Sequence, residues 1–157
     1  MKVIPVLNYS EQKVLRIATG VLGAPKYRVL PKVRMADILK SEVDELSYGD
    51  QSFLIRAHFD NVVIDANSTM PLFSIEFDGP YHKDIHQQSR DVKKNRLCRL
   101  ASFPLLRVGA THLYEHDRAT LLEYMLRRYD LWTTEHSCLM EEIGEYVSTL
   151  RGCVTSR

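Results

Sequence analysis

Apolar and polar residues divide the chain into segments that predict helices and strands. From Ser10, a residue type favoured as a helix N-cap, apolar side chains recur at helical spacing until Gly23 ends the segment. This pattern predicts an amphipathic first helix. Residues 27–33 predict a strand, in which Pro31 indicates an edge strand or the end of the strand. Residues 35–49 predict a short helix and a polar loop.

Two further strand-like segments follow, separated by turn residues. Residues 53–65 have a β-branched centre, and residues 72–78 are mostly apolar. The run Asn-Ser-Thr-Met-Pro at 67–71 is typical of a turn, so the two segments are predicted to form a hairpin. We therefore expect Asp60 to lie on the strand antiparallel to the one that carries Glu76. The register between them is left open by the sequence.

The second half of the chain predicts a helix, a strand and a helical tail. Residues 84–101 read as a helix with Asp84 as its cap, and residues 103–108 as a short strand. The core-facing residues expected on that helix are Leu97, Leu100 and Ala101. A strand, helix, strand order implies a parallel neighbour in the sheet. With a mostly helical tail over 117–150, the order α-β-β-β-α-β followed by helices predicts an α/β domain with a mixed central sheet.

Composition narrows the function classes. A chain of 157 residues, 45% hydrophobic, fits a single domain with a real core. Its formal net charge of +1 gives no global attraction to nucleic acid or membrane, so a site for a polyanion must be local or completed by a partner. Three cysteines without Cys-x-x-Cys spacing argue against a disulfide framework and a zinc site, which favours the reducing cytoplasm. No run approaches the ~20 apolar residues of a membrane span, and no membrane partner is expected.

The clearest chemical signal is an apolar strand that ends on two carboxylates. In a strand, Glu76 and Asp78 share one face and lie roughly 6.5 to 7 Å apart. Their charges repel each other, and one cation can be held near both, so the pair calls for a metal, a proton or open water. The alternative interpretation is the solvated face of a half-exposed strand, where most acids reside.

With Asp60, Glu76 and Asp78, the nearby His82 and Lys83 complete a candidate constellation. Hard cations such as Mg²⁺ bind one or two carboxylates and keep waters for substrate phosphates. Such an ion lowers the pKa of a bound water and polarises a phosphoryl oxygen, while a lysine or histidine orients the water. The sequence therefore predicts a phosphodiesterase site.

The helix that follows has a polar face beside this site. Gln87, Asp91, Lys94 and Cys98 recur at spacings of four, three and four. Basic residues in and after this face could grip phosphates on either side of a scissile bond without reading sequence. The alternative is a solvated surface on which Asp91 and Lys94 form an exposed ion pair of small energetic worth.

Taken together, these motifs resemble the restriction-endonuclease-like, or PD-(D/E)XK, nuclease superfamily. The resemblance is carried by Glu11 on the first helix, Asp60 in Phe-Asp-Asn-Val-Val, and Glu76 in Ile-Glu-Phe-Asp-Gly, and is extended by residues 87–99 and 104–108. Within the superfamily, Val-Leu-Pro-Lys-Val-Arg at 29–34 is similar to a small bacterial domain of unknown function. The turn Asp-Gly-Pro-Tyr-His is similar to that of very-short-patch mismatch-repair endonucleases.

The resemblance implies a nuclease core over residues 8–110, a helical extension over 111–151, and Mg²⁺ or Mn²⁺ as cofactor. The implied metal ligands are Asp60, Glu76, the Phe77 carbonyl and, through water, Glu11. The candidate catalytic residues, from the carboxylate pattern and the resemblance together, are Asp60, Glu76, Asp78, His82 and Lys94. The expected nucleic-acid contacts are Lys83, Gln87, Arg90, Lys93 and Lys94.

One position departs from the family pattern. The lysine two residues after the second acid is Asp78 here. Lys94 or Lys83 could substitute for it, or His82 could act as the base as in the mismatch-repair relatives, and without such a substitute the site would bind metal but cut poorly. The sequence thus predicts a metal-dependent nuclease acting on nucleic acid, with DNA expected. The alternative is a weak or inactive nuclease-fold module that binds nucleic acid or assembles with a partner. A homodimer and a larger protein partner are both compatible with the sequence.

Overall fold

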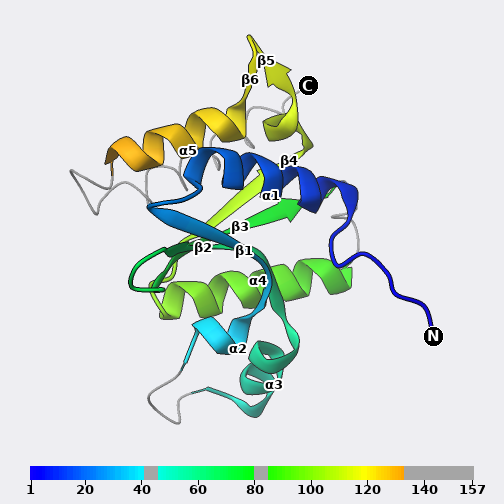
Figure 1. The fold of residues 1–157 in the computed structure, drawn as a ribbon. Coiled ribbons are helices and arrows are strands. Elements are labelled where there is room, and N and C mark those ends of the chain that lie inside the picture. The colour runs from blue at the N-terminus through cyan, green and yellow to red at the C-terminus, as the bar shows by residue number, and fades with distance from the viewer. Residues whose placement is uncertain (41–45, 80–84, 133–157) are drawn as a thin grey trace, which may run out of the picture.

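A mixed four-stranded sheet between two layers of helices forms the centre of the computed structural model, which describes residues 1–40, 46–79 and 85–132 (Figure 1). The sheet has the order β1-β2-β3-β4, with β1 (Tyr27–Arg34), β2 (His58–Asp65), β3 (Pro71–Asp78) and β4 (Leu105–Gly109). The α-helices are α1 (Tyr9–Leu22), α2 (Met35–Ile38), α3 (Tyr48–Arg56), α4 (Ile85–Leu100) and α5 (Leu121–Trp132). Between β4 and α5 lie the 3-10 turn η1 (Ala110–Leu113) and a small hairpin of β5 (Glu115–His116) and β6 (Ala119–Thr120).

This architecture confirms the predicted α/β class and the order α-β-β-β-α-β around the sheet. The expected hairpin is present, since β2 and β3 pair antiparallel, and β3 pairs parallel with β4 after the α4 crossover. The register pairs Asn61 with Ile75. Asp60 therefore lies across from Glu76, which the sequence left open.

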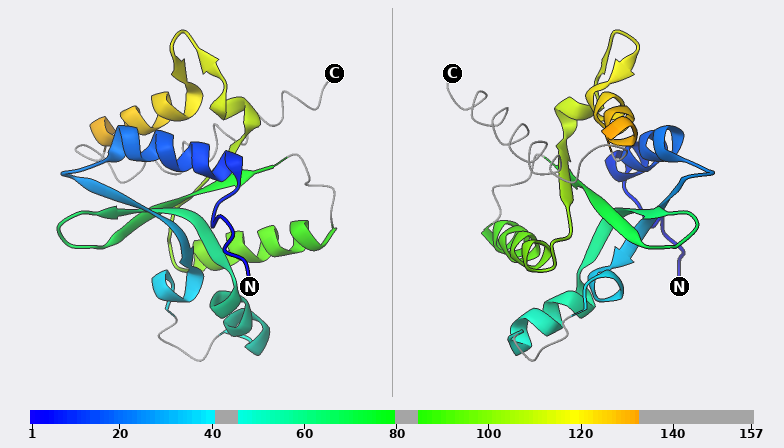
Figure 2. Two further views of the ribbon diagram at one scale, coloured as in Figure 1. Left: turned by 45° about the vertical axis from the view of Figure 1, so that its right-hand side comes forward. Right: turned by 90° about the vertical axis from the view of Figure 1, so that its left-hand side faces the viewer.

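Two buried clusters fill the space on the two faces of the sheet. Helices α1 and α5 cover one face, and α2, α3 and α4 lie on the other side (Figures 1 and 2). The first cluster packs α1 and α5 on the sheet and includes Val14, Ala18, Leu22, Val63, Phe73, Ile75, Val108, Leu122 and Leu126. The second packs α2, α3 and α4 on the opposite face and includes Met35, Leu54, Phe59, Val62, Ile64, Leu97 and Cys98.

Strand β1 changes face at Lys32. Residues four apart in a regular strand point to the same side, yet Val29 packs against the first cluster and Val33 against the second. Lys32, between them, has a left-handed backbone with φ of 52°. The switch lets one strand contribute to both cores and sets Lys32 apart from the regular alternation.

Some predicted boundaries were wrong. Residues 53–56 belong to α3 and not to a strand, because a short apolar run fits either period, and Ser47 starts a helix by accepting from the Asp50 N–H. The N-cap of α1 is Asn8, not Ser10. Among the expected core residues of α4, Leu97 is buried.

Three further expectations also failed. Leu100 is 65% exposed because it lies on the flank of the α4 face that Leu97 and Cys98 turn to the sheet. Ala101 follows the end of the helix and is exposed as well. Residues 117 and 118 form the turn between β5 and β6, and residues 119–120 belong to β6, in place of the expected helix start. The expected cap Asp84 and the tail from residue 133 lie outside the described residues. No described helix has the length and apolar content that crossing a bilayer demands.

Candidate active site

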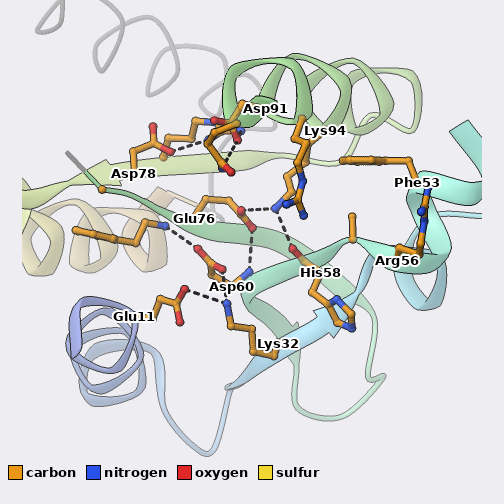
Figure 3. A pocket seen from close by; sticks show the side chains of 16 residues that line it. Glu11, Lys32, Phe53, Arg56, His58, Asp60, Glu76, Asp78, Asp91 and Lys94 are labelled. Carbon is orange, nitrogen blue, oxygen red and sulfur yellow. Dashed lines mark hydrogen bonds and ion pairs between the residues drawn. The ribbon is translucent and has the colours of Figure 1, made fainter. Parts of the chain in front are cut away.

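A pocket of about 670 Å³ opens where all four strands of the central sheet meet α1, α3 and α4 (Figure 3). It is lined by Glu11, Lys32, Phe53, Arg56, Ala57, His58, Asp60, Glu76, Phe77, Asp78, Gly79, Gln87, Arg90, Asp91, Lys94 and Arg107. In the view of Figure 3, Asp60 and Glu76 lie in the middle of the pocket. Phe53 and Arg56 of α3 lie toward one end, and Asp78 and Asp91 lie toward the other. The structure thus brings together most of the site predicted from the sequence.

The two central acids hold each other's strands in register. The backbone N–H of Asp60 donates to Glu76 Oε1 at 3.0 Å, and the N–H of Phe77 donates to Asp60 Oδ2 at 3.1 Å. The Ser74 hydroxyl donates to the same Glu76 oxygen at 3.2 Å. Since these contacts come from β2 and β3 themselves, the hairpin fixes both carboxylates before any ligand arrives.

Glu76 is the most deeply buried acid of the pocket, and its counter-ion comes from α4. Its residue is 5% exposed, and Lys94 Nζ forms an ion pair with Oε2. The same ammonium donates to the His58 carbonyl at 2.9 Å. Burial raises the pKa of Glu76, with a further increase from the charge of Asp60, against the lowering effect of Lys94.

Lys32 joins Glu11 to Asp60 on the other side of the site. Its ammonium lies 2.9 Å from Glu11 Oε1 and 2.9 Å from Asp60 Oδ1. Although burial alone lowers its pKa, the hydrogen bonds to Asp60 and Glu11 outweigh that effect, and the pKa of Lys32 is raised. A left-handed backbone costs roughly 1 to 2 kcal/mol for a residue other than glycine. Sequence reasoning missed Lys32, because a lysine after Pro31 gives no sign of the face to which it turns.

Glu11 caps the first helix and also lines the pocket. Asn8 and Glu11 form a reciprocal capping box, in which the Asn8 side chain accepts from the Glu11 N–H at 3.0 Å. The Asn8 N–H donates in return to Glu11 Oε2, also at 3.0 Å. The other carboxylate oxygen is left to face Lys32.

Asp78, which stands where the resemblance expects a lysine, is paired with Arg107 of β4. The guanidinium lies 2.6 Å from Asp78 and 3.3 Å from Asp91, and it also donates to Asn95. Burial lowers the pKa of Arg107, but the charge of Asp78 and its hydrogen bond raise it by more. This network ties β3, β4 and α4 together at one end of the pocket.

The residues expected to contact nucleic acid are divided. Gln87, Arg90 and Lys94 line the pocket, while Lys93 turns to α3, with Nζ 3.4 Å from Asp50 and 3.2 Å from the Gly49 carbonyl. His82 and Lys83 lie outside the described residues. Phe53 and Arg56 of α3 form a wall that the sequence did not indicate, because that segment was taken for a strand.

Comparison with known proteins gives one match. A family described as a protein of unknown function, DUF2726, matches residues 3–123. The chain belongs to the DUF2726 family. The matched region includes every pocket residue described above. No curated protein and no solved structure matches the chain.

The donor chemistry of this DUF2726 pocket fits a hard divalent cation with few protein ligands. Among the described residues, no three carboxylate, imidazole or thiol side chains converge as they would around an all-protein cage. Mg²⁺ is usually bound by one or two carboxylates and completed by water and substrate phosphates. Asp60 and Glu76, fixed on adjacent strands in a pocket with room for such a substrate group, match that pattern.

Proposed function

We propose that this DUF2726 chain is a metal-dependent nuclease of the PD-(D/E)XK type, which hydrolyses phosphodiester bonds of nucleic acid, with DNA as the expected substrate. The observation that carries the proposal is the Asp60–Glu76 pair, locked across the β2–β3 hairpin at the centre of the pocket with Lys94 on Glu76. Asp60, Glu76 and Lys94 keep the order acid, acid, lysine that the resemblance implies, although the lysine does not lie two residues after Glu76, and all three line the pocket.

Asp60, Glu76 and the Phe77 carbonyl would hold Mg²⁺ or Mn²⁺. Bound there, the ion would polarise a phosphoryl oxygen and lower the pKa of a water. The hydrogen bonds that Asp60 and Glu76 accept keep both carboxylates in place for this task, so little reorganisation is needed when substrate binds.

Lys94 takes the part of the lysine that the chain lacks two residues after Glu76. It reaches the Glu76 carboxylate from α4, while Asp78 is engaged with Arg107. From this position its ammonium can orient the attacking water or stabilise charge on the phosphoryl group. Gln87 and Arg90 on the same helix, with Arg56 across the pocket, are placed to contact phosphates on either side. We place this activity in the cytoplasm, where the buried Cys98 thiol stays reduced.

One observation favours the alternative, a nuclease-fold module that binds nucleic acid with little or no cutting. Asp60 and Glu76 already have ammonium partners, Lys32 and Lys94, which neutralise part of the charge that a divalent cation requires. A site of this kind could hold its shape without metal and act through binding.

The two functions are separated by a cleavage assay on supercoiled, linear and single-stranded DNA and on RNA, in Mg²⁺ or Mn²⁺. Wild type is compared with Asp60→Asn and Glu76→Gln, and with Glu115→Gln as a control in the exposed β5 strand. We expect cutting by wild type and by the control, and none by the two site variants. Unchanged cutting in both site variants would contradict the nuclease assignment. Salt-dependent binding without metal-dependent turnover would favour the binding module.

A further inference from the structure

The ammonium of Lys32 occupies a cation position within the candidate site. It is shared between one oxygen of Glu11 and one oxygen of Asp60, each 2.9 Å away, so it bridges α1 and β2. Two carboxylates from separate elements that converge on a single positive charge are also how a protein holds a divalent ion. Here the charge is supplied by the chain itself.

The two carboxylates are fixed independently of the lysine. Glu11 uses its second oxygen to accept the Asn8 N–H at 3.0 Å, and Asp60 uses its second oxygen to accept the Phe77 N–H at 3.1 Å. Their side chains are only 13% and 15% exposed. The cradle of two oxygens would therefore remain in place if the ammonium were removed.

The backbone of β1 departs from extended geometry at the residue that delivers this charge. Lys32 has φ of 52°, a conformation that glycine adopts readily and lysine does not. Strain of this kind persists where the surrounding structure over-determines it, and it clusters at functional sites. The two ion pairs of Lys32 are the contacts that hold its side chain in the pocket.

We propose that Lys32 is a built-in cation that fills the position between Glu11 and Asp60 and so limits the site to one divalent ion, bound at Asp60 and Glu76. The proposal rests on the proposed nuclease function for that one ion. A second divalent ion at Glu11 would have to displace the ammonium or bear its repulsion. Glu11 is then the partner of Lys32 and not a ligand that acts through water, as the resemblance implied.

The test counts the Mn²⁺ ions bound by the full chain without nucleic acid, from the free Mn²⁺ signal in electron paramagnetic resonance. Lys32→Gly removes the ammonium and suits the left-handed backbone, so it should keep the fold, which circular dichroism checks. We expect Lys32→Gly to bind one more Mn²⁺ per chain than wild type. Lys32→Arg keeps the positive charge and should bind the same number as wild type. Adding Glu11→Gln to Lys32→Gly should abolish the extra ion.

The counts separate this proposal from the proposed function. One ion in wild type and two in Lys32→Gly support both. None in wild type and one in Lys32→Gly supports the role of Lys32 and contradicts the ion at Asp60 and Glu76. Equal counts in wild type and Lys32→Gly overturn the built-in cation, whatever that count is, and so does an extra ion that survives Glu11→Gln.

Discussion

At the scale of single residues, Glu76 and Lys94 depend on each other more than any exposed ion pair does. Their side chains are 6% and 11% exposed, and burial raises the pKa of the Glu76 carboxyl. Removal of one partner from a buried pair leaves an uncompensated charge, which costs far more than the pair itself contributes. The same two residues therefore affect both the proposed chemistry and the stability of the fold.

This dependence predicts that Lys94→Met lowers the free energy of unfolding by about 3 to 5 kcal/mol, measured by urea denaturation. The double variant Lys94→Met with Glu76→Gln should recover part of the loss, because the buried carboxylate is then gone. Lys93→Met is the matched control, since Lys93 is 36% exposed in its pair with Asp50 and should cost at most about 1 kcal/mol. Equal, small losses in both lysine variants would show that the Glu76 charge is compensated by something other than Lys94.

At the scale of elements, α3 is attached to α4 by Asp50. This carboxylate accepts from Arg96 of α4 at 2.5 Å and from the Ser47 hydroxyl at 2.8 Å, and it lies 3.4 Å from Lys93. The hydrogen bond from Arg96, followed by that from Ser47, lowers the pKa of Asp50 from 3.8 to about 2. Because α3 carries Phe53 and Arg56, this attachment also positions one wall of the pocket.

The lowered pKa predicts how the attachment responds to acid. Because its pKa is lowered, the ionised Asp50 carboxylate stabilises the fold fully above pH 4. This stabilisation is lost as the pH falls toward 2, where the folded state must accept a proton that it binds poorly. Urea unfolding of wild type and Asp50→Asn should differ most near pH 5 and converge as the pH falls toward 2. Asp117→Asn controls for the loss of one surface carboxylate. A difference that stays constant down to pH 2.5 would contradict the role of the Asp50 charge.

The β2–β3 hairpin and strand β1 show which parts of the fold could be predicted from the sequence. The hairpin that brings Asp60 near Glu76 was predictable, because two apolar strands flank a clear turn. Their register was not, since a shift of one residue reverses every side chain and the pairing is irregular between Val63 and Ile64. Lys32 could not be placed, because the face of β1 reverses at its own left-handed backbone.

The partner of Asp78 was equally out of reach. The sequence singled out Asp78 because it departs from the family pattern, and Asp78 does line the pocket. Its counter-ion Arg107 lies 29 residues away on a parallel strand, so only the three-dimensional pairing of β3 with β4 joins them. Local pattern fixes which strand carries an acid, and long-range packing decides which cation meets it.

At the scale of the whole molecule, the sheet separates two buried clusters. Unfolding is a single cooperative event only if the helices on both faces of the sheet come away from it together. The second cluster contains Cys98, which is 2% exposed. Burial raises the pKa of this thiol to about 12, so in the folded state it is neutral as well as covered. Thiolate is the reactive form, and modification at neutral pH therefore requires opening of the α4 layer.

Cys98 can thus report whether the α2, α3 and α4 layer opens by itself. In a Cys138→Ser, Cys153→Ser background, the rate of thiol modification gives the free energy of the opening that exposes Cys98. We expect this value to equal the free energy of unfolding from urea denaturation, because the two clusters share strand β2. Phe59 and Val62 of β2 belong to the same cluster as Leu97 and Cys98, and Val63 of β2 belongs to the first cluster. A clearly smaller value would mean that this layer opens as a separate unit. The Lys94–Glu76 pair, which spans α4 and β3, would then be broken in each such opening, and the pocket would be lost while the rest of the sheet stayed folded.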